Sequence, residues 1–154
     1  MKNSITIGLP SKGRLKESSI SFLGKKNLKL ISDGDERNYF ATIEDFSNFK
    51  VIYLHSKEII QRLGDGTLDL GISGLDLLCE SPANLRKKIE IKKKLDFGKA
   101  NLVVAVPDDW IDVQTIADLE EVSFEFRDKK NTRLRVATKY PNLTNDFLIS
   151  KGVT

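Results

Sequence analysis

The chain has 154 residues, of which 40% are hydrophobic and 31% charged, and its net charge is +3. This length allows one domain, or one small domain and part of another. The single cysteine, Cys79, excludes an internal disulfide, and the single histidine, His55, excludes a histidine-rich metal centre. The first residues lack the apolar core of a secretory signal, and no apolar run approaches the ~20 residues of a membrane span, so we expect a cytoplasmic protein.

Strands and helices are predicted to alternate along the first half, which is the pattern of an α/β fold. Short apolar and β-branched runs predict strands at residues 5–9, 28–31, 39–43, 51–54 and 68–72. Ser11 and Ser56 are the predicted N-caps of two helices, and a third, short helix passes through Leu77 and Leu78. Because strands alternate with helices here, we expect parallel pairing.

In the second half, alternating apolar residues predict strands at residues 89–95, 102–106 and 134–137. Helices are predicted across 117–129 and at 142–151, the latter with Leu143, Phe147 and Leu148 facing inward and Gly152 at its C-terminal end. We place a lobe boundary at the turn around Gly98, between residues 1–97 and 98–154. Since Gly152-Val153-Thr154 has the pattern of a helix stop and a new strand, we expect the natural protein to be longer.

The loop after the first strand, Pro10 to Leu15, combines a glycine with two cations at the start of a helix. Backbone N–H groups at a helix start favour anions, and a glycine lets the backbone approach a ligand closely. Arg14 can hold a phosphate through two parallel hydrogen bonds, while Lys12 supplies a compact charge. A surface helix capped by Ser11, with two solvated cations, explains the same residues.

Two further strand-to-helix junctions carry small and polar residues. The amides of Ser73 and Gly74 could hydrogen-bond a base or phosphate, although such turns also use Gly and Ser for geometry alone. The junction from Thr138 to Thr144 offers hydroxyl groups and one cation. Arg37 lies in a polar loop, where it could contact a phosphate or remain solvated.

Five stretches, taken in order, resemble the short form of the ATP phosphoribosyltransferase catalytic subunit. They are Leu9 to Leu15, Gly66 to Leu78, Leu95 to Ala100, Val103 to Pro107 and Val136 to Thr144. The resemblance implies a two-lobed α/β fold like that of type II periplasmic binding proteins, with an incomplete second lobe. It also implies transfer of the phosphoribosyl group from phosphoribosyl pyrophosphate to N1 of ATP, which begins histidine biosynthesis, with Mg²⁺ carried by the phosphoribosyl pyrophosphate.

The resemblance also implies roles for individual residues. Lys12 and Arg14 would be catalytic, stabilising the phosphates and the reacting centre. The residues that would bind substrate are Ser11, Gly13, Arg37, Gly71, Ser73, Gly74, Thr138 and Tyr140. No residue is expected to bind a metal directly.

Short forms of this family work with a regulatory subunit that resembles histidyl-tRNA synthetase, so we expect a hetero-oligomer, and a homodimer is also open. Two departures from the family pattern stand out. Many relatives have an arginine near the position of His55 and Ser56, and the family's Ser/Thr-Thr-Gly-x-Thr run does not occur in residues 1–154. We therefore expect this chain by itself to have little transferase activity.

Two other classes of protein remain open. One is a non-enzymatic module that binds a small ligand with the same two-lobed architecture. The other is a nucleic-acid-binding protein, which the basic runs at 86–88 and 92–94 would allow. Ile89, Ile91 and Leu95 instead favour a solvated strand, and no recognition motif supports nucleic-acid binding. We expect neither a nucleic-acid nor a membrane partner.

Overall fold

The structure, a computed structural model, describes residues 4–32 and 39–153. It divides into two compact units, residues 1–100 and residues 101–154. The elements of the N-terminal unit are β1 (Ile5–Pro10), α1 (Gly13–Gly24), β2 (Leu30–Ile31), β3 (Phe40–Ile43), β4 (Phe46–Leu54), α2 (Ser56–Gly64), β5 (Leu70–Gly71), α3 (Leu75–Glu80) and α4 (Ala83–Arg86). Those of the C-terminal unit are α5 (Ile116–Lys130) and α6 (Pro141–Ser150).

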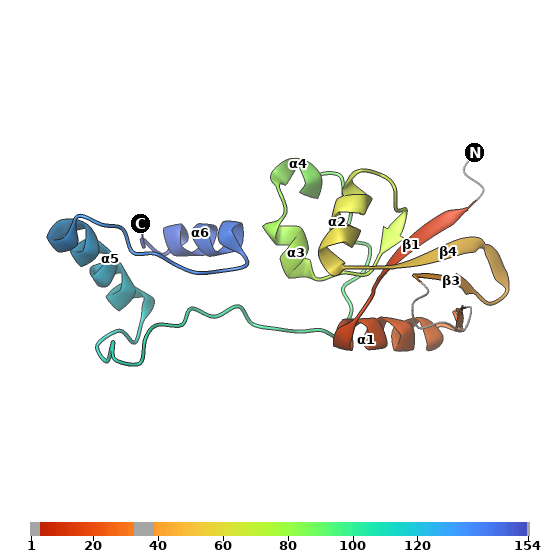
Figure 1. Cartoon of the computed structure of the whole chain (residues 1–154), viewed down its shortest axis with the longest axis horizontal. Helices are drawn as coiled ribbons and strands as arrows, with labels where there is room; N and C mark the ends of the chain where they lie inside the picture. The colour runs from red at the N-terminus through yellow and green to blue at the C-terminus, as the bar shows by residue number, and fades with distance from the viewer. Residues whose placement is uncertain (1–3, 33–38, 154) are drawn as a thin grey trace. The chain divides into compact units, whose positions relative to one another are not determined.

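One mixed sheet organises the N-terminal unit (Figure 1), with the strand order β2-β3-β4-β1-β5. The central strand β1 pairs in parallel with β4 on one side and with β5 on the other. The strands β2, β3 and β4 are joined by antiparallel pairing. The predicted parallel pairing is therefore confirmed only for β1, β4 and β5, where β1 lies between the two strands that α2 connects, and it is wrong for β2 and β3.

Helices cover both faces of this sheet. On one face, Leu23 of α1 joins Leu9 of β1 and Val51 of β4 in the main core, and Leu9 and Val51 are completely buried. On the other face, α2 packs close to the backbone of β1. A Cβ atom at Gly8 would lie 3.3 Å from Cγ2 of Ile59, which is itself completely buried. The unit is therefore an open α/β sheet with a helix on each face, as the alternation of strands and helices along the sequence predicts.

Both predicted serine caps are wrong by one residue. Lys12 is the N-cap of α1 and His55 is the N-cap of α2. The cause at Ser11 is that its backbone N–H donates to the carbonyl of Leu54 at 2.8 Å. Ser11 thus continues the ladder between β1 and β4, and the helix begins only after the chain has left the sheet.

The C-terminal unit is built around two helices. Thr115 and Asp118 form a capping box at the start of α5, in which Thr115 N–H donates to the Asp118 carboxylate at 2.6 Å. A small core comprises Leu119, Leu148 and Val153, with Trp110 packed against it. Two helices predicted from periodicity are thus confirmed.

The orientation predicted for α6 is only partly right. Leu148 is buried and Leu143 is half-buried, but Phe147 is 42% exposed, so its inward placement is wrong. Gly152 follows the helix with a φ of 82°, a conformation that glycine adopts readily.

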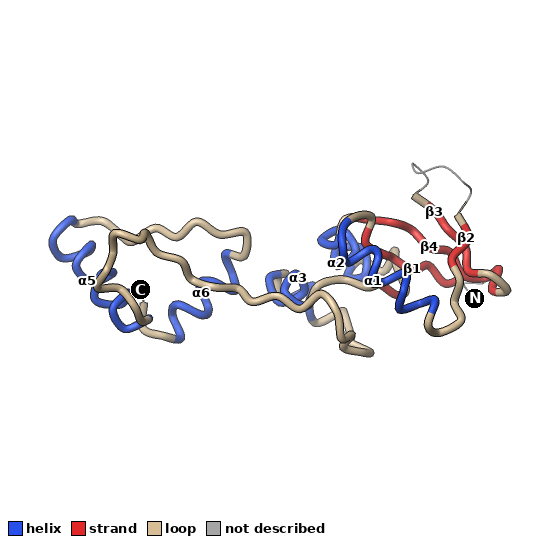
Figure 2. Tube along the Cα trace, turned by 90° about the horizontal axis from the view of Figure 1, so that it is seen from below, coloured by secondary structure: helices blue, strands red, loops and turns tan. Residues whose placement is uncertain are grey.

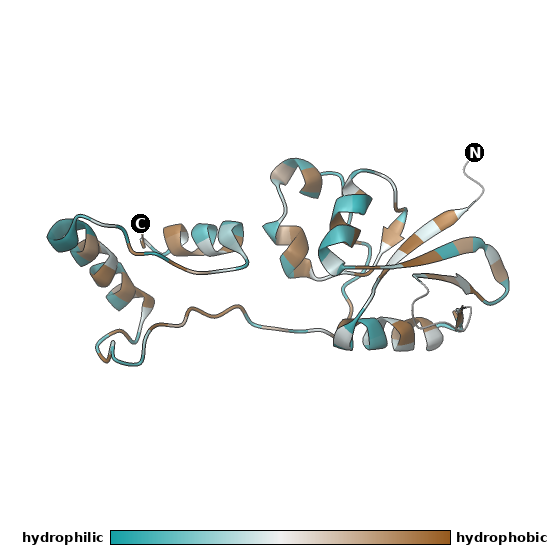
Figure 3. Ribbon diagram, in the orientation of Figure 1, coloured by the Kyte–Doolittle hydropathy of each residue, from teal (hydrophilic) through white to brown (hydrophobic). Residues whose placement is uncertain are grey.

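Three predicted strands do not form in the described part of the chain. Residues 89–95, 102–106 and 134–137 are irregular, and the strands found in residues 4–32 and 39–153 all lie in the N-terminal unit (Figure 2). The hydrophobic stretch at 102–106 is visible ahead of α5 (Figure 3), and Val103 within it is 74% exposed. A strand needs a neighbouring segment to complete its hydrogen bonds, and no such segment pairs with these residues among 4–32 and 39–153.

Candidate functional site

The sheet of the N-terminal unit has a point at which successive connections leave in opposite directions. After β1 the chain crosses one face through α1 and reaches β2, whereas after β4 it crosses the other face through α2 and reaches β5. Ligands of open α/β sheets bind outside the carboxyl ends of strands at such a point. A recess of about 190 Å³ lies here, lined by Ser11, Lys12, Leu54, His55 and Ser56.

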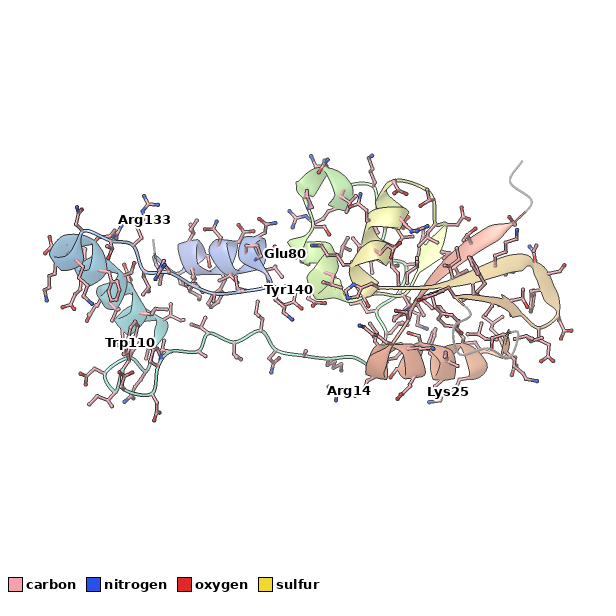
Figure 4. All side chains as sticks on the ribbon, in the orientation of Figure 1. Arg14, Lys25, Glu80, Trp110, Arg133 and Tyr140 are labelled. Carbon is pink, nitrogen blue, oxygen red and sulfur yellow. The ribbon has the colours of Figure 1, made fainter. Side chains whose placement is uncertain are left out.

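The start of α1 presents backbone and cationic groups to solvent near this recess. No side chain caps the helix, because Lys12 stands at the N-cap position. Gly13 has a φ of 71°, which favours glycine, and its missing Cβ would meet no atom within 4 Å. Lys12 lines the recess, while Arg14 lies outside its lining at the exposed beginning of α1 (Figure 4).

The loop after β5 is tied to the loop after β4 by a side-chain hydrogen bond. The Ser73 hydroxyl donates to the carbonyl oxygen of Ser56 at 2.8 Å, and both residues are partly buried. The Ile72 N–H donates to the carbonyl of Gly8 at 3.0 Å. The predicted residues Ser11 to Arg14 and Gly71 to Gly74 therefore come from neighbouring strand ends of one sheet.

Packing supplies a structural reason for one predicted ligand-binding glycine. A Cβ atom at Gly71 would lie 2.6 Å from Cγ2 of Ile59 and 3.1 Å from Cδ1 of Leu63. The close approach of α2 to β5 thus requires glycine at this position, whether or not a ligand binds. Its role in binding substrate stays a prediction.

The two predicted residues of the C-terminal unit have local partners. The Tyr140 N–H donates to the Thr138 hydroxyl at 3.0 Å, and the hydroxyls of Thr138 and Thr144 are 3.1 Å apart. These bonds shape the turn into α6. Thr138 also lines a recess of about 460 Å³, together with Ser123, Arg127, Arg133, Leu134, Val136, Pro141, Thr144, Asn145, Leu148, Ile149 and Val153.

Arg37 lies outside the described residues. Within residues 4–32 and 39–153, no three His, Cys, Asp or Glu side chains gather in a way that could hold a metal ion. In the same residues, no helix has the length and apolar character needed to cross a membrane.

The amino-acid sequence is similar to those of known proteins over nearly its whole length. The sequence model of the ATP phosphoribosyltransferase (HisG) family matches residues 55–154. An ATP phosphoribosyltransferase of Mesorhizobium japonicum is 46% identical over 147 residues, which are 96% of this chain and 63% of the relative. This chain belongs to the ATP phosphoribosyltransferase family. The resemblance noted in the sequence motifs is thereby confirmed.

Other ATP phosphoribosyltransferases have similar identity. That of Brucella melitensis is 44% identical over 148 residues, covering 96% of this chain and 64% of the relative. That of Nitrobacter winogradskyi is 44% identical over 153 residues, covering 99% of this chain and 47% of the relative. The chain thus spans less than two thirds of the length of these ATP phosphoribosyltransferases.

Sequence reasoning missed two features of the site. His55 lines the recess beside Lys12, whereas the sequence patterns assigned it no place among the candidate site residues. Its place at a strand end, opposite the cationic loop, was the available signal. The bond from Ser73 to Ser56 spans 17 residues, and no local pattern could have indicated it.

Proposed function

We propose that this chain is the substrate-binding part of an ATP phosphoribosyltransferase catalytic subunit. The reaction joins N1 of ATP to C1 of phosphoribosyl pyrophosphate and breaks the bond from C1 to the pyrophosphate oxygen. Pyrophosphate leaves, and the product enters histidine biosynthesis. Membership of the ATP phosphoribosyltransferase family supports this reaction. Because the relatives are longer than this chain, the reaction is proposed for a catalytic subunit of their length.

The observation that carries this proposal is the position of the loop Ser11-Lys12-Gly13-Arg14. It follows the central strand at the point where the sheet's connections diverge, beside a recess that Lys12 lines. Gly13 holds the left-handed conformation that turns the chain into α1, and the first N–H groups of α1 have no side-chain cap. Cations beside a helix start that no side chain caps suit a phosphate-bearing substrate.

In this proposal, Lys12 and Arg14 stabilise charge that develops as the pyrophosphate leaves. The sugar gains oxocarbenium character while the leaving group becomes strongly anionic, so fixed positive charge lowers the barrier. Binding also orients the two substrates, which can contribute ~7–11 kcal/mol to a bimolecular reaction. The Ser73 hydroxyl contributes indirectly, because its bond to Ser56 holds two loops of the site together.

The same proposal includes the finer features that the family implies. The fold is a two-lobed arrangement like that of periplasmic binding proteins, with the N-terminal unit on the ATP side. Thr138 and Tyr140 contact phosphoribosyl pyrophosphate, which brings Mg²⁺ with it as part of the substrate. A regulatory subunit resembling histidyl-tRNA synthetase completes a cytoplasmic hetero-oligomer.

A chimera tests the proposed activity. Residues 1–154 replace the aligned part of the Mesorhizobium japonicum relative, and pyrophosphate release is measured with ATP, phosphoribosyl pyrophosphate and Mg²⁺. We expect turnover under conditions in which the intact relative is active. The Lys12→Ala chimera should lose about 10²-fold in kcat, the size of effect seen when one group that stabilises transition-state charge is removed.

The control is a Lys25→Ala chimera, which removes an equal charge from the opposite end of α1 and should keep its activity. A folded chimera without turnover would contradict the proposed reaction. Equal losses in the Lys12 and Lys25 variants would contradict the role of the loop.

A further inference from the structure

His55 both caps a helix and lines the recess. It is the only histidine of the chain, it follows directly on β4, and it is exposed. Its backbone is extended, with φ −65° and ψ 138°, and it is the N-cap residue of α2. The same residue lines the recess with Lys12, Ser11 and Ser56.

The two ring nitrogens of His55 are in different situations. Nδ1 accepts a hydrogen bond from the backbone N–H of Lys57 at 3.4 Å, as a capping atom does. A neutral imidazole has one acceptor nitrogen and one N–H donor, so Nε2 carries the hydrogen. No partner for Nε2 occurs among residues 4–32 and 39–153. Only Nδ1 takes part in capping, and serine or asparagine would cap the helix equally well. Nε2 therefore has no role in the cap.

The charges around the recess favour an anion. Its lining contains one ammonium group, two serine hydroxyls and the imidazole, and it contains no carboxylate. The nearest acidic residue in the first turn of α2, Glu58, is paired with Arg62 at 2.7 Å. A volume of about 190 Å³ is smaller than a typical pocket for a whole ligand, so it suits the phosphate end of a larger molecule.

We propose that His55 is a ligand-binding residue that makes two separate hydrogen bonds. Nδ1 caps α2, and Nε2–H donates to a phosphate oxygen of a molecule seated in the recess beside Lys12. This inference rests on the proposed function, since it takes the ligand to be the polyphosphate of ATP or the pyrophosphate of the sugar donor. The capping bond fixes the ring, so Nε2–H is oriented before the ligand arrives.

Two substitutions of His55 each remove one of its two hydrogen bonds and keep the other. In His55→Asn, the side-chain oxygen replaces Nδ1 as the cap, but nothing reaches the position of Nε2. In His55→Gln, the amide nitrogen reaches about as far as Nε2, while the capping atom is lost. Affinities for tripolyphosphate, ATP and phosphoribosyl pyrophosphate are measured by calorimetry on the 154-residue chain, and thermal unfolding reports the cap.

We expect His55→Asn to keep the unfolding temperature and to lose about tenfold in affinity for the ligand, equivalent to ~1.4 kcal/mol. His55→Gln should unfold at a lower temperature and keep its affinity within about threefold. The probe with the largest loss identifies the source of the phosphate. Unchanged affinity of His55→Asn for all probes that bind the wild-type chain overturns the inference.

The single histidine also permits a direct measurement on the unaltered chain. A two-bond proton–nitrogen correlation spectrum contains one imidazole, which should show the tautomer protonated at Nε2 and should shift when tripolyphosphate or ATP is added. If the imidazole signals do not shift while the amide signals of Gly13 and Gly74 do, the inference about His55 fails and the proposed function stands. If neither responds to any of the three probes, both fail.

Discussion

Lys12 and Arg14 are two residues apart, yet the structure gives them different surroundings. Lys12 lines the recess at the end of β1, whereas Arg14 lies in the first turn of α1 outside that lining. In the proposed function, Lys12 meets a phosphate within the recess. Arg14 is proposed to contact the part of a nucleotide that extends beyond the recess, through two parallel hydrogen bonds of its planar guanidinium.

This difference leads to a prediction for Arg14→Ala. Nucleotide affinity should fall by ~1.5–3 kcal/mol, the range for a hydrogen bond to a charged group. Calorimetric titration of the chain with ATP measures the change. Lys25→Ala is the matched control, because Lys25 lies at the opposite end of the same helix (Figure 4). An affinity of Arg14→Ala equal to that of the control would show that Arg14 does not contact the nucleotide.

At the residue level, local sequence patterns did not reveal the contacts that two of the candidate residues make with other segments. Ser11 was interpreted as a cap, but its N–H extends the ladder from β1 to β4. Gly71 was interpreted as a ligand contact, yet the side chain of Ile59 already excludes a Cβ atom there. Both facts depend on a second segment that packs against the residue, and a local pattern carries no information about it.

The same reasoning explains which elements could be predicted. A helix forms its hydrogen bonds within one segment, so hydrophobic periodicity was enough to predict α1, α2, α5 and α6. A strand depends on a partner. Alternation at residues 102–106 and 134–137 indicated an apolar face but supplied no neighbour, and these segments are irregular in the described chain. Where a ladder exists, as between β1 and β4, the prediction succeeded.

The capping box of α5 leads to a prediction about stability. The Thr115 hydroxyl accepts from the Asp118 N–H, and the Asp118 carboxylate accepts from Thr115 N–H in return. Thr115→Ala removes the first of these bonds and should destabilise the chain by ~0.5–2 kcal/mol, as at other N-caps. Thr115→Ser keeps the hydroxyl and is the matched control. Chemical denaturation monitored by circular dichroism measures both, and equal stability of Ala and Ser variants would contradict the role of the cap.

The box also predicts a pH dependence. Hydrogen bonds from the Thr115 hydroxyl, then from the backbone of Thr115 and Gln114, hold the pKa of Asp118 below its ordinary value. Because the folded pKa is lower than the unfolded one, this contribution to stability is present above the unfolded pKa. It is lost as the pH falls through the folded pKa. Carbon-detected NMR titration of the Asp118 carboxyl should show the low pKa, and Thr115→Ala should raise it.

At the scale of the whole molecule, the candidate residues divide unequally between the two units. The loop from Ser11 to Arg14, His55 and the segment from Gly71 to Gly74 all belong to residues 1–100. That unit also contains the five strands of the described residues and its own core. Only Thr138 and Tyr140 belong to residues 101–154, where their described bonds shape the turn into α6. The proposed contacts to ATP therefore lie in one unit.

This division predicts that residues 1–100 alone will fold and bind ATP. The affinity should lie within about threefold of that of the 154-residue chain, which corresponds to ~0.6 kcal/mol. Binding of phosphoribosyl pyrophosphate should be weaker in the shorter chain, since Thr138 and Tyr140 are proposed to contact it. Calorimetry with each substrate measures the two affinities, and a Lys12→Ala variant of residues 1–100 is the control for binding at the recess. A loss of ATP affinity of tenfold or more in a folded 1–100 chain would place essential ATP contacts in residues 101–154.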